Sequence, residues 1–351
     1  MATNTYVFEL RRDECASVCS RAEEQEENEE KKAGKGFVPT APSEVPSLRA
    51  HVVETLLPLV ERMGGIGVYT SARSDLLADE REMAYHAERV TTSIMSVGVS
   101  VCDDVRGLLR LVWSTSRGIK ATKSDMGMLV AVFVCVDDRI DRVVIYTTPV
   151  VSSQSPASQR NVACIVGPPR VRPDIKDIAW IRDRKDVEER GRQAMAKLGY
   201  GTPSDVLLCT QRGELLEGLI TNLFVLVEDN STKHRCRLQT APEGTVLAGV
   251  ARRKVIEACH ELGIPVDLTC PRISERHLWQ GVFLTNSIRQ LQPLDRVCCV
   301  DTNVWELDPW VWEPAKQGLA GAEATDVTGV VMAHRCIRTI SEMVVDSHDI
   351  K

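Results

Sequence analysis

Three short segments in the second half of the chain place polar side chains inside, or at the end of, apolar runs. The first, residues 214–227, reads E-L-L-E-G-L-I-T-N-L-F-V-L-V, so that Glu217 interrupts an otherwise apolar stretch. Burying a carboxylate is costly unless a cation or hydrogen-bond donors satisfy it. Two interpretations stay open: Glu217 forms a local ion pair with a lysine or arginine, or it is held in place to meet a cationic group of a ligand.

The second segment, residues 245–252, reads T-V-L-A-G-V-A-R and leads into a strongly amphipathic stretch that predicts a helix from Ala251 to Leu262. Gly249 would let the backbone N–H groups of Val250 and Ala251 approach a ligand, and the helix dipole favours an anion at this end. A glycine before a helix is also common in a plain turn. The pattern therefore allows an anion site without requiring one.

The third segment, residues 282–293, reads V-F-L-T-N-S-I-R-Q-L-Q-P. A predicted strand over Val282–Leu284 ends in three consecutive hydroxyl or amide side chains, Thr285, Asn286 and Ser287. Several neutral donors at one point suit a phosphate or a carboxylate, although the same residues are ordinary in turns.

These segments must be positioned by a fold in which helices and strands are mixed along the whole chain. Hydrophobic periodicity and turn residues assign the elements. The predicted helices cover residues 48–62, 80–93, 184–198 and 251–262, and the predicted strands cover residues 66–69, 101–115, 128–136, 142–146, 178–182, 206–209, 215–228 and 282–284. Two α+β halves joined by an exposed linker are the expected architecture.

Composition divides the chain further. Residues 22–32 are nearly all charged or amide and cannot bury enough apolar surface to offset the entropy of folding. The predicted parts are a disordered acidic tail (1–45), an N-terminal α/β domain (46–148), a Ser- and Pro-rich linker (149–163), a C-terminal domain (164–300) and a C-terminal extension (301–351). Three close tryptophans in the extension, Trp305, Trp310 and Trp312, predict burial against the core or against a second subunit.

The overall composition excludes several classes of protein. With 43% hydrophobic residues in 351 the chain is not disordered throughout, and no apolar run approaches the length of a membrane span. A net charge of −6 argues against non-specific nucleic-acid binding. The 12 cysteines contain no C-x-x-C and predict buried free thiols in a reducing compartment, hence a cytoplasmic protein. Scattered histidines indicate no metal site, and the absence of G-x-S-x-G leaves Ser-His-Asp hydrolysis without support.

Taken in order, the three segments resemble the C-terminal domain of the class IV pyridoxal-phosphate enzymes, which include branched-chain aminotransferases, D-amino acid aminotransferases and aminodeoxychorismate lyases. The likeness is to an E-G-x-x-x-N-hydrophobic strand, an L-x-G-hydrophobic-x-R helix start and an F-L-T-N-S…P block. In the first half, G-V-Y-T-S-A-R at residues 67–73 resembles the family's early strand, and H-A-E-R-V at residues 86–90 its H-x-x-R-L helix. The resemblance implies an α+β fold with a small N-terminal α/β domain and a larger C-terminal α/β pseudo-barrel domain.

The resemblance also implies roles for individual residues. Pyridoxal 5'-phosphate would be the cofactor, with Arg89 on its phosphate and Glu217 on its pyridine nitrogen. Residues of the other two segments would complete the cofactor site: Gly249, Val250, Ala251, Asn286 and Ser287. The family usually has a threonine where this chain has Ala251. An amino-acid-like substrate and a homodimer are the implied partners.

The chain departs from the family at the lysine that forms the imine with the cofactor. The best alignment places Arg182 at that position, and a guanidinium cannot form an imine with the cofactor aldehyde. Lys185, in the first turn of the predicted helix, is the expected replacement. Lys176 is a poorer candidate because a predicted strand, 178–182, intervenes. Two functions stay open: an active transaminase or lyase, or a catalytically inactive relative that uses the fold and its anion pocket for ligand binding or assembly.

Overall fold

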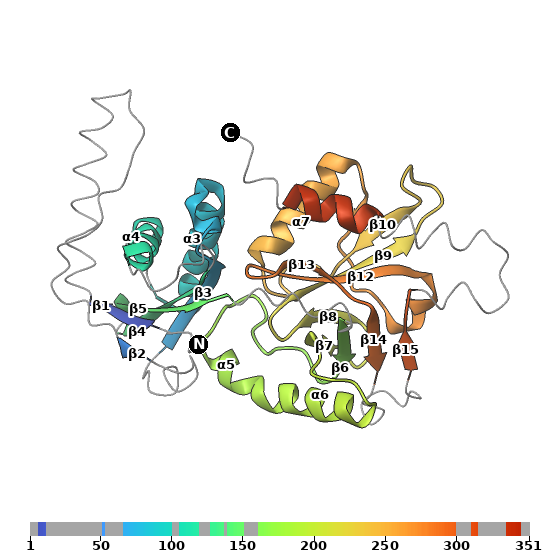
Figure 1. The fold of residues 1–351 in the computed structure, drawn as a ribbon, viewed down its shortest axis with the longest axis horizontal. Helices are drawn as coiled ribbons and strands as arrows, with labels where there is room; N and C mark the ends of the chain where they lie inside the picture. Colours follow the sequence, from blue (N-terminus) through green and yellow to red (C-terminus); the bar gives the residue numbers. More distant parts are fainter. Residues whose placement is uncertain are drawn as a thin grey trace. The chain divides into compact units, whose positions relative to one another are not determined.

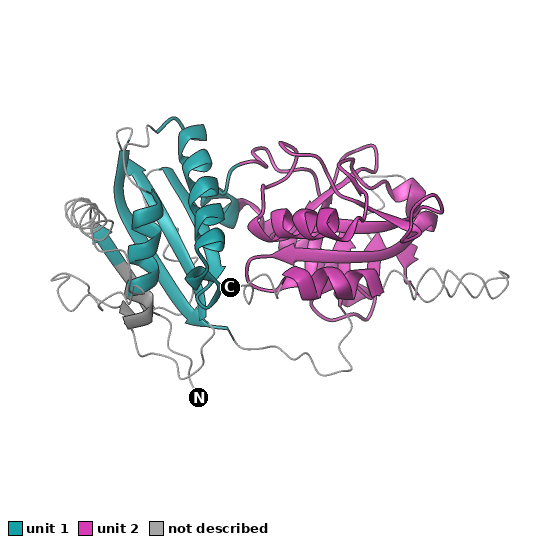
Figure 2. Cartoon of the chain, turned by 90° about the horizontal axis from the view of Figure 1, so that it is seen from above, with its two compact units in different colours: residues 1–152, 175–182 teal, residues 153–174, 183–351 magenta. Residues whose placement is uncertain are grey.

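The structure is a computed structural model that describes nine segments of the chain: residues 6–11, 51–52, 66–99, 105–118, 127–136, 139–150, 161–299, 310–314 and 335–344. The chain folds into two compact units (Figure 2). Unit 1 contains residues 1–152 and 175–182, and unit 2 contains residues 153–174 and 183–351. No described helix is long and apolar enough to cross a membrane.

Unit 1 is built on a five-stranded antiparallel sheet whose strands follow the order β2-β1-β5-β4-β3. The strands are β1 (Tyr6–Arg11), β2 (His51–Val52), β3 (Ile66–Arg73), β4 (Gly127–Val136) and β5 (Arg139–Pro149). Helices α3 (Glu80–Ser96) and α4 (Val105–Gly118) cover one face, and the short helix α5 (Ala179–Asp183) packs on the other (Figure 1). A short 3-10 helix, η1 (Leu76–Ala78), connects β3 to α3.

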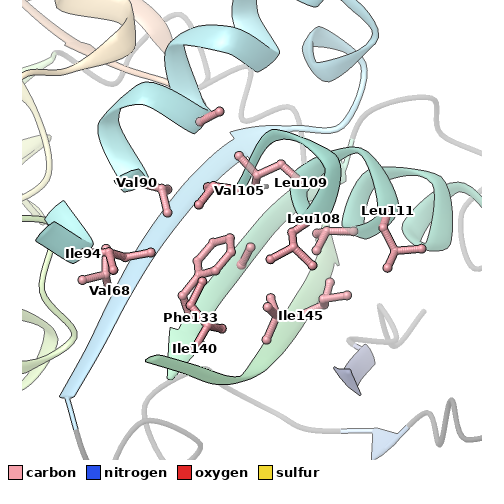
Figure 3. Packing of buried hydrophobic residues seen from close by; sticks show 14 of the residues in the cluster. Val68, Val90, Ile94, Val105, Leu108, Leu109, Leu111, Phe133, Ile140 and Ile145 are labelled. Carbon is pink, nitrogen blue, oxygen red and sulfur yellow. The ribbon is translucent and has the colours of Figure 1, made fainter. Parts of the chain in front are cut away.

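The strand predicted over residues 101–115 is wrong, because this part of the chain forms α4. Val105, Leu108, Leu109 and Val112 are buried and recur at the i, i+3, i+4 and i+7 spacing of a helix. They pack with Phe133 and Ile145 of the sheet in the main apolar cluster of unit 1 (Figure 3). A stretch rich in Val and Leu has high strand propensity, but burial of one helical face decided its conformation.

The strand predicted over residues 178–182 is also wrong. Asp177 forms an isolated antiparallel bridge with Val68 of β3, and its Oδ1 then accepts a hydrogen bond from the backbone N–H of Ala179 (2.7 Å). This side-chain acceptor starts α5. Ile178, just before the helix, and Ile181, within it, are buried against the sheet. The segment Ile175–Arg182 thus belongs to unit 1 and not to the C-terminal domain to which the sequence assigned it.

Two other expectations fall on the N-terminal part of the chain. Residues 6–11 lie inside the predicted disordered tail, yet they form β1 and pair with β5, burying Val7 and Leu10; for these six residues the prediction is wrong. The acidic run 22–32 lies outside the described residues. The helix predicted over 48–62 is described only at residues 51–52, which form strand β2.

Unit 2 contains a ten-stranded sheet with the path β11-β10-β9-β8-β7-β6-β14-β15, from which β12 pairs with β9 and β13. Its strands are β6 (Val162–Ile165), β7 (Asp205–Cys209), β8 (Leu215–Gly218), β9 (Asn222–Glu228), β10 (Cys236–Gln239), β11 (Val266–Asp267), β12 (Trp279–Asn286), β13 (Gln290–Pro293), β14 (Arg296–Cys299) and β15 (Trp310–Trp312). One apolar cluster takes side chains from β15, at one end of this path, and from β9 and β12, and Trp279 of β12 contacts Trp312 of β15, so this part of the sheet curls around an interior.

Helices cover the outside of this curled sheet (Figure 1). Helix α6 (Lys185–Lys197) lies on β6 and β7, where Gly191 leaves no room for a larger side chain beside Val206 and Cys164. Helix α7 (Val250–Leu262) and a helix at residues 335–344 pack together on β9, β10 and β12. A 3-10 helix, η2 (Ile273–Leu278), precedes β12.

The C-terminal extension and the cysteines follow the sequence predictions where the structure describes them. Trp312 is buried, and Trp310 and Trp312 contact Trp279 edge-on, so these tryptophans pack on the core of unit 2. Trp305 lies outside the described residues. The nine described cysteines are free thiols, and all except Cys270 are buried.

Candidate active site

The three polar segments found in the sequence converge in unit 2. Glu217 on β8 lies directly opposite Asn222 on β9, and Asn222 lies directly opposite Thr285 on β12. Residues opposite each other in antiparallel strands project from the same face, so these side chains form a row across three strands. All three are buried, with exposures of 3%, 5% and 1%. We call Glu217, Asn222 and Thr285 the polar row.

The polar row fixes the loop that leads into α7. Glu217 Oε2 accepts a hydrogen bond from the backbone N–H of Leu247 (3.0 Å), and Asn222 Nδ2 donates to the carbonyl of the same residue (2.9 Å). The other carboxylate oxygen, Oε1, lies 3.4 Å from Nη1 of Arg170, and both of these side chains are buried. The ion-pair interpretation of Glu217 is thus confirmed, and Arg170 is a residue that sequence reasoning missed.

Gly249 is required by the close approach of this loop to the polar row. A Cβ at residue 249 would lie 2.1 Å from Asn222 Oδ1, so no other residue fits without displacing the row. Gly249 is also the N-cap residue of α7 and has no side chain to bond the first-turn N–H groups. The helix start, which includes Val250 and Ala251, therefore presents backbone donors and the positive end of the helix dipole.

The third segment contributes one side chain with an open hydrogen-bonding capacity. Within the described part of the chain, Thr285 Oγ1 is buried and has no hydrogen-bond partner. Asn286 instead uses its Oδ1 to accept the N–H groups of Ile288 (3.0 Å) and Arg289 (2.8 Å), which shapes the turn between β12 and β13. Ser287 is buried beside it. Thr285, rather than Asn286, is thus the residue of this segment whose polar group still needs a partner.

Asp205 is a second residue that sequence reasoning missed. Its carboxylate accepts hydrogen bonds from three backbone N–H groups, of Val206, Leu219 and Ile220, and from the Thr221 hydroxyl, which fixes the turn between β8 and β9. Burial raises its pKa above the ordinary value, while these hydrogen bonds oppose the rise. Because this turn holds Glu217 opposite Asn222, Asp205 supports the geometry of the polar row.

Unit 1 contains its own buried polar group, which we call the Arg89 cluster: Thr70, Glu82, His86 and Arg89. All four residues are less than 10% exposed. Arg89 Nη2 donates to Thr70 Oγ1 (2.6 Å) and lies 3.2 Å from His86 Nδ1, while the Thr70 hydroxyl lies 2.7 Å from the same nitrogen. Since both neighbours are donors toward Nδ1, that nitrogen accepts, and the imidazole proton resides on Nε2.

The electrostatics of the Arg89 cluster follow from its burial. Burial lowers the pKa of His86 to about 4, with the charge of Arg89 acting in the same direction and Glu82, 3.6 Å from Nε2, acting against it. Burial also lowers the pKa of Arg89 to about 10, which leaves the guanidinium charged near neutral pH. In the described part of the chain, Arg89 Nε is buried without a hydrogen-bond partner. A buried cation with an unused donor is suited to an anionic ligand.

The residues considered for imine formation occupy different environments. Arg182 is exposed in α5, and Lys185 is exposed at the first position of α6 in unit 2. Lys176 is partly buried in unit 1, where its Nζ lies 4.6 Å from the centre of the Tyr69 ring. Among the described residues no group of three or more His, Cys, Asp or Glu side chains could hold a metal ion.

The comparison with known families agrees with this geometry. A family model described as "Amino-transferase class IV" matches residues 83–297. This range contains His86 and Arg89 of the Arg89 cluster and all three residues of the polar row. The chain belongs to the class IV aminotransferase family. No curated protein matches it in sequence.

Three solved structures with a similar fold are distant from this chain in sequence. The branched-chain amino acid aminotransferase from Escherichia coli is 19% identical, with a TM-score of 0.52 over 68% of this chain and 78% of that one. A branched-chain aminotransferase from the thermophilic archaeon Thermoproteus uzoniensis, with norvaline, is 18% identical, with a TM-score of 0.51 over 83% and 93%. A hypothetical aminotransferase from Mycobacterium tuberculosis in a PLP-bound form is 14% identical, with a TM-score of 0.54 over 85% and 97%. These matches bear out the two-domain α+β fold inferred from the sequence.

Proposed function

We propose that the protein is a pyridoxal-phosphate-dependent enzyme that transfers or eliminates the amino group of an amino-acid-like substrate. The observation that carries the proposal is the buried polar row beside the uncapped start of α7. Within the described residues, Thr285 Oγ1 is a buried hydroxyl without a partner in this row, and a phosphorylated ligand would supply an oxygen acceptor for it. The donor set therefore fits the cofactor.

Each proposed binding residue has one task. Glu217 would accept a hydrogen bond from the protonated nitrogen of the pyridine ring, and its position is already fixed by Arg170 and by the N–H of Leu247. The backbone N–H groups of Val250 and Ala251, together with the hydroxyls of Thr285 and Ser287, would hold an anion at the helix start. When bound, a pyridine ring that is kept protonated withdraws electrons from the carbon atom next to the amino group of the substrate.

Measurements of cofactor absorption and of turnover test this proposal. The purified protein, mixed with pyridoxal 5'-phosphate, should develop an absorption band near the visible edge of the spectrum and should transfer amino groups between amino acids and keto acids. Glu217→Gln should abolish turnover, whereas Glu228→Gln, an exposed carboxylate at the end of β9, should not. A protein that stays colourless and takes up no cofactor would exclude the proposal.

A second candidate function is a non-catalytic relative, which the Arg170–Glu217 ion pair favours because that carboxylate already has a cationic partner. Such a protein would bind inorganic phosphate and pyridoxal 5'-phosphate equally well, since only the anion site would be used. Much tighter binding of the pyridoxal compound, or any turnover, would exclude it. We also propose that the protein forms a homodimer, which light scattering of the purified protein tests. A cytoplasmic location is proposed as well, and cell fractionation tests it.

A further inference from the structure

Two buried cysteine thiols that are 100 residues apart in the sequence touch each other in unit 2. Cys236 begins strand β10, and Cys336 lies in the first turn of the helix at residues 335–344. The Cys236 thiol donates a hydrogen bond to the sulfur atom of Cys336, and 3.8 Å separates the two sulfur atoms. We call Cys236 and Cys336 the thiol pair. The pair joins the 335–344 helix to the sheet of unit 2.

Apolar packing on both sides holds the thiol pair in place. Both cysteines belong to the cluster that the 335–344 helix and α7 form with β9, β10 and β12, and Figure 1 shows this helix in red beside α7. On the helix, Ile337, Ile340 and Val344 are buried in the same cluster, so the rotation of the helix is fixed. A disulfide bond is about 2.05 Å long, so the two sulfur atoms, now 3.8 Å apart, need to approach by about 2 Å. Rotation about two Cα–Cβ bonds can supply this approach.

Within the pair, Cys336 has the surroundings of a reactive thiolate. The hydrogen bond from Cys236 and the charge of Arg335 lower the pKa of the Cys336 thiol, although burial acts against them. The first turn of a helix also stabilises a thiolate. In contrast, burial raises the pKa of the Cys164 and Cys298 thiols well above the ordinary value. Cys336 is therefore the nucleophile of the pair, and Cys236 is the thiol that follows it.

The neighbours of the thiol pair narrow the chemistry that it supports. Cys259 on α7 is a third thiol of the same cluster, but it is fully buried, and burial is the main reason that its pKa is raised. A metal ion would need further ligands, and the described residues contain no group of three or more His, Cys, Asp or Glu side chains that could hold one. Two thiols in contact, one of them activated, suit oxidation to a disulfide.

We propose that Cys236 and Cys336 are a site of reversible oxidation, at which hydrogen peroxide generates a disulfide that anchors the 335–344 helix to β10. The inference is independent of the proposed function. The Cys336 thiolate attacks one peroxide oxygen, an S–O bond forms, the O–O bond breaks, and the leaving hydroxide takes up a proton to become water. The Cys236 sulfur then attacks the oxidised sulfur, an S–S bond forms, and the S–O bond breaks. The hydroxide leaves with the Cys236 proton as a second water molecule, so that two thiols are oxidised and one peroxide is reduced.

Peptide mapping of the full chain tests the site without measuring activity. The folded protein is treated with hydrogen peroxide, its remaining thiols are alkylated, and it is digested without reductant by a protease that cuts after glutamate. Cys236 then lies in fragment 229–243, Cys336 in fragment 324–342 and Cys259 in fragment 258–261. We expect fragments 229–243 and 324–342 to appear linked, with the loss of two hydrogen atoms in mass, and to separate on reduction. The number of free thiols per chain should fall by two from 12.

Matched variants complete the experiment. Cys236→Ser should abolish the linked fragments and leave Cys336 as an oxygen-bearing acid, whereas Cys164→Ser should leave the linked fragments unchanged. Cys164 is a suitable control because it is also buried and lies opposite another cysteine, Cys298, across β6 and β14. A link from Cys336 to Cys259 or to any cysteine other than Cys236, or 12 free thiols after treatment with peroxide, would overturn the proposal. The map of the wild-type protein decides even if a variant fails to fold.

The anchoring of the helix has a test of its own. A disulfide across 100 residues restricts the unfolded chain, so the urea midpoint of the wild-type protein should rise on oxidation and return on reduction. Cys164→Ser should show the same rise, and Cys236→Ser should show none. A linked protein whose midpoint does not rise would overturn the anchoring of the helix by this bond.

Discussion

The buried imidazole of His86 should make the stability of the protein depend on pH. Its pKa is lowered from 6.5 to about 4, mainly by burial. Between these two pH values the folded state holds the neutral imidazole, whereas the unfolded state takes up a proton. Because the folded-state pKa is the lower one, the contribution of His86 is fully present above about pH 6.5 and is lost as the pH falls toward about 4.

The size of this loss follows from the same two values. One pKa unit corresponds to about 1.4 kcal/mol, so the interval from 6.5 to about 4 corresponds to about 3 kcal/mol of unfolding free energy. A folded domain is stable by about 5–15 kcal/mol, so a change of this size is easily measured.

The measurement compares the wild-type protein with His86→Asn, whose Oδ1 can take the place of Nδ1 as acceptor for the Thr70 hydroxyl but does not titrate. Urea denaturation at several pH values gives the unfolding free energy of each, and carboxylates common to both proteins cancel in the difference. The advantage of the wild-type protein should shrink by about 3 kcal/mol from neutral pH to about pH 4. His260→Asn, an exposed histidine on α7, should give a constant difference. Parallel pH profiles for wild type and His86→Asn would refute the reasoning.

Three further predictions concern the site in unit 2. Gly249→Ala places a Cβ 2.1 Å from Asn222 Oδ1 and should cost about 1–3 kcal/mol of stability in a thermal or urea melt, whereas Gly201→Ala, which meets no neighbour within 4 Å, should be neutral. Glu217→Gln leaves a buried arginine without its counter-charge and should lower stability by about 3–5 kcal/mol, measured by urea denaturation; an unchanged melt would contradict the ion pair. Thr285→Val removes a buried hydroxyl that has no partner in the described residues, so it should leave the ligand-free stability unchanged or raised while weakening cofactor binding in equilibrium dialysis; equal affinities would show that the hydroxyl does not contact the ligand.

Much of the fold was predictable because local periodicity and burial agree. The helix over 251–262 and the strand over 128–136 were found within one residue of their observed bounds, since each presents one strong apolar pattern. The predictions failed at residues 101–115 and 178–182, where β-branched or apolar residues recur at a spacing that fits either element. There the packing of one face against the unit 1 sheet decided the conformation, and no local pattern reports on that.

The candidate site divides in the same way. Glu217 in an apolar run, Gly249 before a helix and Thr285 after a strand were visible as isolated oddities, because each conflicts with or terminates its local pattern. The alignment of Glu217 and Thr285 with Asn222 in the polar row depends on the register of β8, β9 and β12, and Gly249 approaches this row through the loop before α7. Of the two residues that sequence reasoning missed, Asp205 left a usable signal, because it is an acidic residue at the start of an apolar, buried strand.

By itself, the sequence determined which residues needed specific partners or surroundings. A carboxylate in an apolar strand predicts a cationic partner, and a glycine before an uncapped helix permits another group to approach the backbone closely. Only the tertiary structure decided which partners they found. Arg170 reaches Glu217 across 47 residues, and Lys176 is attached to β3 and α3 although 83 residues separate it from Ser93. Such pairings depend on the burial of entire elements against one another, and that is a property of the packed chain rather than of any short segment.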